Sequence, residues 1–154
     1  MAHPSAETRT WLSRLVAYDT TSRESNLPLI EDVAAAARGL GAIVNVFPTP
    51  DGRKANLVVT VPDASGGVRG GVLLSGHSDC VPVDGQAWTS DPFEVVERDG
   101  RLVGRGTADM KGFLACCLAA LPAMLERPLR EPVHIGLSYD EEVGCVGAPP
   151  FVAS

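Results

Sequence analysis

The order of apolar and polar residues divides the chain into alternating helical and extended segments. Apolar residues at helical spacing predict an amphipathic helix over residues 5–18, with Ser5 as its N-cap. A second helix is predicted over residues 27–40, where Asn26 is a candidate cap and Gly41 a candidate stop. A third is predicted over residues 112–125, and the last residues resemble the start of another helix.

Short runs rich in β-branched residues lie between these helices and predict strands. They are AIVNVF, NLVVTV, GVLLSG and PVHIGLSY, in chain order. The stretch FEVVERDGRLVG has Asp99-Gly100 between two alternating segments, which predicts a hairpin. Helices that alternate with buried strands favour an α/β fold with a mixed, mostly parallel sheet flanked by helices. The hairpin is the part of that sheet expected to be antiparallel.

Composition and charge narrow the class of protein. The chain has 154 residues, 45% of them hydrophobic and 21% charged, which is typical of one globular domain. The net charge is −6 and the sequence has no basic stripe, so a nucleic-acid partner is not expected. The longest apolar run, FLACCLAALPAML, is too short to span a bilayer and contains Pro122, so no membrane association is expected.

The N-terminus and the cysteines indicate the compartment. The first residues, MAHPSAETRT, lack the basic region and apolar core of a signal peptide, so a cytoplasmic protein is expected. The four cysteines show no C-x-x-C spacing, which favours reduced thiols that serve packing.

Polar residues that could carry chemistry follow two of the predicted strands. His77 and Asp79 follow GVLLSG, and Glu141 and Glu142 follow PVHIGLSY. In α/β sheets, ligands bind beyond the carboxyl ends of the strands, so these groups are expected on one rim. A carboxylate two residues from a histidine can hold the imidazole N–H, as in many metal sites, although a plain surface His–Asp pair gives the same pattern.

Asp109 lies in the loop GRGTADMKG, just before the third predicted helix. Taken alone, an aspartate at this position is an ordinary N-cap. The glycines around it give more backbone freedom than a cap needs, which favours a turn that directs the carboxylate at a ligand. Glu141 and Glu142 are neighbours and would point apart in an extended chain. They are either two solvated glutamates or a metal ligand next to a proton acceptor.

Three stretches together carry a resemblance to a known family. SGHSDCVPVDGQAWTSDPF, DGRLVGRGTADMKG and SYDEEVGCVGA resemble the zinc metallopeptidase family that contains acetylornithine deacetylase, succinyl-diaminopimelate desuccinylase and glutamate carboxypeptidase. The order and spacing match along nearly the whole chain. YDTTSRESNLPLI and SYDEEVGCVGAP are more similar to the deacetylase branch than to the others.

The resemblance implies a role for each candidate residue. It implies that His77 and Glu142 each bind one of two divalent ions and that Asp109 bridges them, with a cis peptide often following that aspartate. It also implies that Asp79 orients His77 and that Glu141 is the general base. Zinc is the expected metal, with cobalt or manganese as alternatives that the ligand types do not separate.

The implied reaction is hydrolysis of an N-acyl amino acid. Two metal ions would polarise the amide carbonyl and acidify a bridging water, and Glu141 would take its proton. The expected substrate is N-acetylornithine, an intermediate of arginine biosynthesis, and desuccinylation is the alternative. Full-length members of the family are expected to form homodimers.

The sequence departs from the family pattern in its extent. The family supplies a further acidic ligand, a late histidine and a second domain for dimerisation and closure, and none is found in residues 1–154. Residues 1–154 are therefore expected to be the N-terminal part of the catalytic domain, incomplete and inactive alone. A non-catalytic remnant is the alternative of another class, and sequencing the downstream locus would separate the two.

Overall fold

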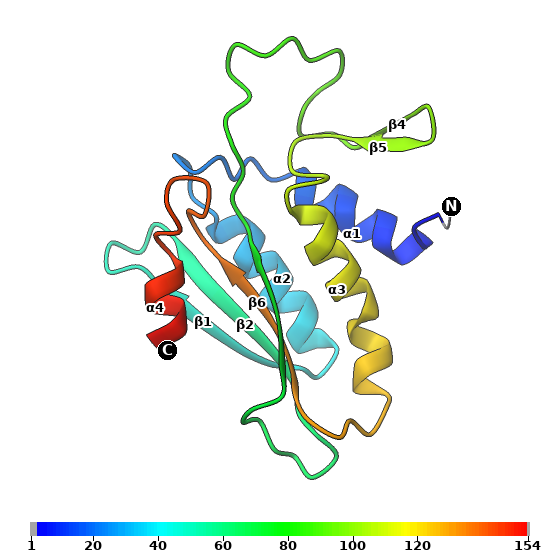
Figure 1. The fold of residues 1–154 in the computed structure, drawn as a ribbon, viewed down its shortest axis with the longest axis vertical. Coiled ribbons are helices and arrows are strands. Elements are labelled where there is room, and N and C mark those ends of the chain that lie inside the picture. The colour runs from blue at the N-terminus through cyan, green and yellow to red at the C-terminus, as the bar shows by residue number, and fades with distance from the viewer. Residues whose placement is uncertain (1–2, 154) are drawn as a thin grey trace.

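The computed structural model describes residues 3–153 as one sheet with helices on both faces and a separate small hairpin (Figure 1). The elements in chain order are α1 (Ala6–Val16), α2 (Leu27–Gly39), β1 (Ile43–Pro48), β2 (Ala55–Val61), β3 (Val72–His77), β4 (Val96–Arg98), β5 (Arg101–Val103), α3 (Lys111–Leu125), β6 (Val133–Ser138) and α4 (Ala148–Ala153). Every helix and strand expected from the sequence is present, with boundaries shifted by a few residues at most.

The main sheet has the strand order β1-β2-β6-β3. The prediction of a mixed sheet flanked by helices is confirmed, but the expectation that it is mostly parallel is wrong. β1 pairs with β2, and β2 with β6, in antiparallel fashion, and only β3 and β6 are parallel. The hairpin β4-β5 forms its own two-stranded sheet, so the antiparallel part of the main sheet lies elsewhere.

One face of the sheet carries the core. Leu57, Val59, Ile135 and Leu137 alternate along β2 and β6 and are fully buried. They belong to the apolar cluster that α1, α2 and α3 contribute to, and Figure 1 shows these three helices together on one side of the sheet. The opposite face meets α4, because a Cβ added to Gly136 would lie 2.5 Å from the Phe151 ring.

The helix ends follow the sequence in one case and depart from it in another. The Ser5 hydroxyl accepts a hydrogen bond from the backbone N–H of Thr8, so the expected cap of α1 is confirmed. Asn26 occupies the N-cap position of α2, as expected, but its side chain makes no capping hydrogen bond. Its buried amide instead donates to the Ala55 carbonyl and to Ser78 Oγ, which joins the start of α2 to the sheet.

The four cysteines are free thiols, but only two of them serve packing. Cys80 and Cys117 are buried, whereas Cys116 and Cys145 are exposed, so the expectation of packing thiols fails for the exposed pair. Within residues 3–153, no helix is long and apolar enough to cross a membrane.

A bidentate ion pair between α1 and α2 gives a test of the fold away from any site. Arg14 Nε and Nη2 lie 2.6 and 2.5 Å from the two carboxylate oxygens of Asp32. We expect Asp32→Asn to lower the free energy of unfolding by about 1 kcal/mol at pH 7, because a half-exposed bidentate pair is worth roughly that much. Urea denaturation of both proteins measures the difference, and Glu31→Asn, an exposed position on the same helix, is the control.

The pH dependence of that difference has a defined sign. Hydrogen bonds from Arg14 hold the pKa of Asp32 below its ordinary value of 3.8. A depressed carboxyl pKa contributes stability above the unfolded pKa, and the contribution disappears as the pH falls through the folded value. The difference between wild type and Asp32→Asn should therefore be present at pH 5 to 7 and shrink below pH 3.8. An unchanged difference at low pH would contradict the ion pair.

Candidate metal centre

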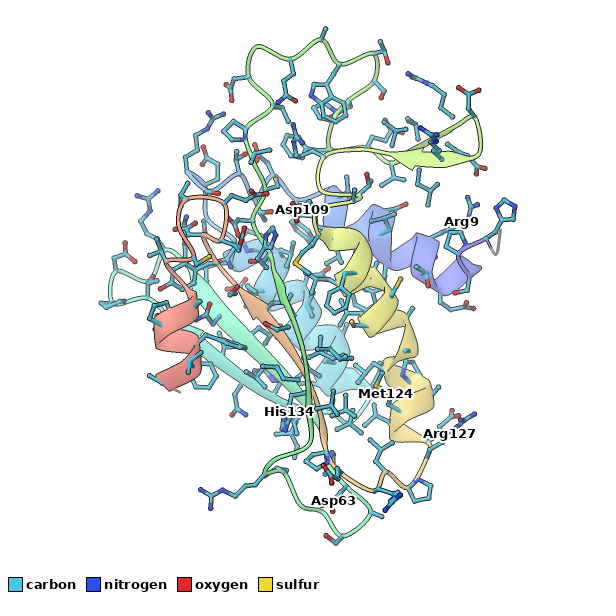
Figure 2. The ribbon with its side chains drawn as sticks, viewed as in Figure 1. Arg9, Asp63, Asp109, Met124, Arg127 and His134 are labelled. Carbon is cyan, nitrogen blue, oxygen red and sulfur yellow. The ribbon has the colours of Figure 1, made fainter. Side chains whose placement is uncertain are left out.

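The predicted site residues gather where β3 and β6 end. These strands are parallel and in register, so that His77 lies opposite Ser138 and the loops after both strands leave the sheet at the same edge. The loop before α3 reaches the same edge, and Figure 2 shows Asp109 there, beside the start of α3 and away from Asp63 and Arg127, which lie toward the bottom of the view.

Three ligand-type side chains converge at this edge. His77, Asp109 and Glu142 each place one ligand atom within 4.8 Å of the others. His77 Nε2 lies 3.0 Å from Asp109 Oδ1, and Glu141 Oε2 lies 3.8 Å from the same nitrogen. The convergence expected from the placement at strand ends is therefore present in the structure.

His77 is held in one orientation by its second ring nitrogen. Nδ1 lies 3.0 Å from the Asp79 carbonyl oxygen and 3.3 Å from Asp79 Oδ1, so an N–H there donates to Asp79 and leaves Nε2 facing Asp109. Burial acts to lower the pKa of the imidazole, but the hydrogen bonds and charges of Asp79 and Asp109 outweigh it and raise the pKa of His77 to about 9. The surroundings of His77 thus favour a positive charge at this position.

Asp79 has more partners than the sequence indicated. Its carboxylate accepts hydrogen bonds from the Ser22 hydroxyl at 2.7 Å and from the backbone N–H groups of Glu141 and Glu142 at 3.0 and 3.2 Å. Burial acts to raise its pKa, but the bonds from His77, Ser22 and the two amides lower the pKa of Asp79 to about 2. Asp79 therefore orients the histidine and also fixes the loop that carries both glutamates.

Asp109 is not the N-cap of α3. The cap position is occupied by Met110, and no side chain caps the helix. The Asp109 side chain is 76% exposed and bonds His77, and the peptide between Asp109 and Met110 is cis, as the resemblance implied. Two glycines shape this loop: Gly106 has a φ of +81°, and a Cβ on Gly112 would lie 2.3 Å from the Thr107 carbonyl oxygen.

Glu141 and Glu142 lie in a turn and not in an extended chain. Asp140 has a φ of +53°, and Gly144 N and Cys145 N donate back to the Glu141 carbonyl. This turn brings both glutamates to the cluster, so the expectation that they point apart does not hold. Burial and the neighbouring carboxylates raise the pKa of Glu142, against the opposing effect of His77. Cys145 Sγ lies 3.6 Å from Glu141 Oε1.

Two lysines beside the site were missed by the sequence reasoning. Lys111 is completely buried, its Nζ donates to the Tyr18 carbonyl at 2.8 Å, and burial lowers its pKa to about 8. Lys54 Nζ bonds the Ser22 carbonyl and Asp140 Oδ1. The sequence held one signal: these are its only lysines, and every other Lys or Arg position is arginine.

The donor set fits a divalent metal ion. One imidazole nitrogen and two carboxylates are ligands that zinc accepts at about 2.0–2.2 Å. Two ligand atoms of one tetrahedral ion at that radius lie roughly 3.3 Å apart, close to the 3.0 Å between His77 Nε2 and Asp109 Oδ1. A cavity of about 230 Å³ opens beside the cluster, with Gly76, Met110 and Cys145 in its wall.

Comparison with known proteins places this geometry in a family. Residues 73–154, more than half of the chain, match the family described as peptidase family M20/M25/M40. The chain belongs to this peptidase family. It is 44% identical over 146 residues to the acetylornithine deacetylase of Myxococcus xanthus, and the matched stretch covers 94% of this chain and 37% of that relative. The acetylornithine deacetylase of Proteus mirabilis is 41% identical over 139 residues, covering 90% and 35%.

Solved structures of M20 proteins share the fold. Human carnosine dipeptidase 1 superposes with a TM-score of 0.76 at 27% identity, over 95% of this chain and 34% of its own. The M20 family metallo-carboxypeptidase Sso-CP2 of Sulfolobus solfataricus gives a TM-score of 0.77 at 21% identity, over 96% and 34%, and supports the fold alone. The chain thus spans about a third of the length of the M20 relatives that it matches.

Proposed function

We propose that this chain carries the metal-binding and proton-transfer residues of a metal-dependent amidohydrolase that removes the acetyl group from N-acetylornithine. The observation that supports it most is the cluster of His77, Asp109 and Glu142 within 4.8 Å, with Glu141 beside it. Two relatives that are 41% and 44% identical over at least 90% of the chain are acetylornithine deacetylases, which supports this substrate. The proposal includes a cytoplasmic role in arginine biosynthesis.

Each residue has a proposed part in binding two ions, of which zinc is the first choice. His77 and Glu142 each have a ligand atom within 4.8 Å of one on Asp109, whose exposed carboxylate would be the ligand shared by the two ions. Asp79 holds the His77 ring so that Nε2 faces Asp109. When bound, such ions polarise an amide carbonyl and lower the pKa of a nearby water.

Glu141 is the proposed general base. Its side chain is 44% exposed and its Oε2 lies 3.8 Å from His77 Nε2, so it borders the cluster and a water at the cluster can reach it. It would take a proton from the attacking water and return it to the leaving amine. Its backbone is fixed by the bond from its N–H to Asp79, which limits how far the carboxylate can drift.

A chimera tests the proposal, because the matched relatives are more than twice as long as this chain. The 154 residues replace the matching stretch of the Myxococcus xanthus deacetylase, and release of ornithine from N-acetylornithine is measured with zinc or cobalt present. We expect turnover within about tenfold of the parent enzyme, and loss of at least a hundredfold in His77→Ala.

The second substrate and the controls complete this test. N-succinyl-diaminopimelate is assayed in parallel, and preference for it would favour desuccinylation instead. His134→Ala, a change near the start of β6 and so at the other end of the sheet from the cluster, is the control for histidine removal. A folded chimera that retains metal but hydrolyses neither substrate would contradict the proposed function.

A further inference from the structure

The irregular segment Tyr18–Ser22, between α1 and α2, is connected to all three loops that carry the proposed ligands, directly to one of them and through a lysine side chain to each of the other two. We propose that this anchor segment is a positioning element for the metal cluster, and that Lys54 and Lys111 fasten two of the loops to it. The inference rests on the proposed function, since it concerns the same cluster. It assigns roles to two side chains that take no part in ligation or proton transfer.

The first attachment is to the loop after β3. Ser22 N donates to the Cys80 carbonyl and Cys80 N donates to the Thr20 carbonyl, both at 3.2 Å, so the segment pairs with this loop like a short strand. Thr20 Oγ1 donates to the Ser78 carbonyl at 2.6 Å and Ser22 Oγ to Asp79 Oδ2 at 2.7 Å. The histidine and its orienting carboxylate are therefore fixed relative to the segment.

The second attachment is to the loop of Asp109. The Lys111 ammonium donates to the Tyr18 carbonyl at 2.8 Å, and its backbone N–H donates to the Gly106 carbonyl at 2.8 Å. A Cβ on Gly106 would lie 3.1 Å from Lys111 Cδ, so the loop passes directly over the lysine stem. Lys111 thus links Asp109, two residues away, to the anchor segment.

The third attachment is to the turn of the two glutamates. Lys54 Nζ bonds both the Ser22 carbonyl and Asp140 Oδ1, and the two ion-paired side chains are only 14% and 15% exposed. Asp140 adopts the left-handed conformation immediately before Glu141. Holding its carboxylate fixes the point at which the chain turns toward the cluster.

Stability alone does not account for these lysines. A buried ammonium with a single carbonyl acceptor, as at Lys111, is costly, and a buried ion pair such as Lys54–Asp140 is often no more stable than a pair of apolar groups of similar size. What the three bonds of these lysines do provide is a fixed position, relative to the anchor segment, for loops from distant parts of the sequence. Ligands held by such outer contacts bind metal more tightly, typically by 10–100-fold.

The test uses Lys54→Met and Lys111→Met in the chimera with the Myxococcus xanthus deacetylase, with Arg53→Met as the control. Arg53 is exposed and adjacent to Lys54, so its loss removes the same charge without removing a bond to the anchor segment. Hydrogen exchange without metal should become faster by at least tenfold around residues 139–146 in Lys54→Met and around 104–110 in Lys111→Met. Arg53→Met should change neither segment.

Cobalt titration then measures the consequence for the cluster. We expect the dissociation constant for Co²⁺ to rise by about 10–100-fold in both lysine variants, with an altered visible absorption spectrum, while Arg53→Met keeps the wild-type values. If Lys111→Met does not fold, the exchange and cobalt data on Lys54→Met alone test the positioning role. Unchanged exchange and unchanged cobalt affinity in folded variants would overturn the positioning role. Wild-type chimera that binds no cobalt would instead contradict the proposed function, and the exchange data would still decide the positioning.

Discussion

Glutamine in place of Glu141 should remove most of the turnover of the chimera while leaving its metal content unchanged. An amide cannot accept the proton of the attacking water, and loss of a general base costs about 10²–10⁴-fold in rate. Glu141 borders the cluster, 3.8 Å from His77 Nε2, and the group of three mutually close ligand atoms does not include it. Steady-state rates and metal content after gel filtration measure the two effects separately.

Substitution of the neighbouring residue, Glu142, should affect metal content more than the rate of the metal-loaded enzyme. Glu142 belongs to the cluster, and its pKa is raised by burial and by the carboxylates around it, so a cation there would relieve the repulsion. Glu142→Gln should therefore lower metal retention first, and turnover should recover in part at high metal concentration. Glu131→Gln, an exposed glutamate before β6, should change neither quantity. Normal turnover by Glu141→Gln would rule out its role as the base.

Local pattern was enough to find the helices, the strands and the strand ends where polar residues gather, whereas the family resemblance was needed to choose the three ligands among them. The stripe of Leu12, Leu15 and Val16 has helical spacing, and all three are buried in the structure. Asp99 and Gly100 both have positive φ, as a tight hairpin turn requires. The polar residues at the edge of the sheet were found because an apolar run in the sequence stops where its strand ends, and ligands bind beyond the carboxyl ends of such strands.

Strand order and direction were not predictable in the same way. Alternation of helices and strands favoured parallel pairing, but β1 and β2 are joined by a short turn and β2 then pairs with β6, with Leu57 opposite Leu137. That contact is between residues 80 positions apart, and no local periodicity encodes it. The parallel rule held only for β3 and β6, which α3 connects.

The supporting contacts of the site were hidden for a similar reason. Asn26 has the residue type and position of a cap, yet its amide is satisfied by Ala55 and Ser78 across the fold. Lys111 follows Asp109 in a way that suggests a solvated helix start, yet it is completely buried. A polar side chain reveals its type in the sequence, whereas its partner is determined by tertiary packing.

The 154-residue chain alone should release no measurable ornithine from N-acetylornithine. Among residues 3–153, the metal-ligand cluster consists of His77, Asp109 and Glu142. Each catalytic zinc usually takes three protein ligands, and sharing Asp109 would still leave two for each ion. The expected result is weak, exchangeable metal binding and a poorly held attacking water.

The open edge of the sheet adds a second reason to expect no activity. β6 lies inside the sheet, so the unpaired edge on that side is β3, where Val72 and Leu73 are 53% and 50% exposed. An apolar, unpaired edge favours association between chains, so we expect marginal stability and aggregation at high concentration. Size-exclusion chromatography, cobalt titration and an ornithine assay on one sample, with the chimera as positive control, measure all three expectations. Robust turnover by a monodisperse, folded sample would show that this chain, or its self-association, supplies the remaining ligands, and the three-ligand argument would then be wrong.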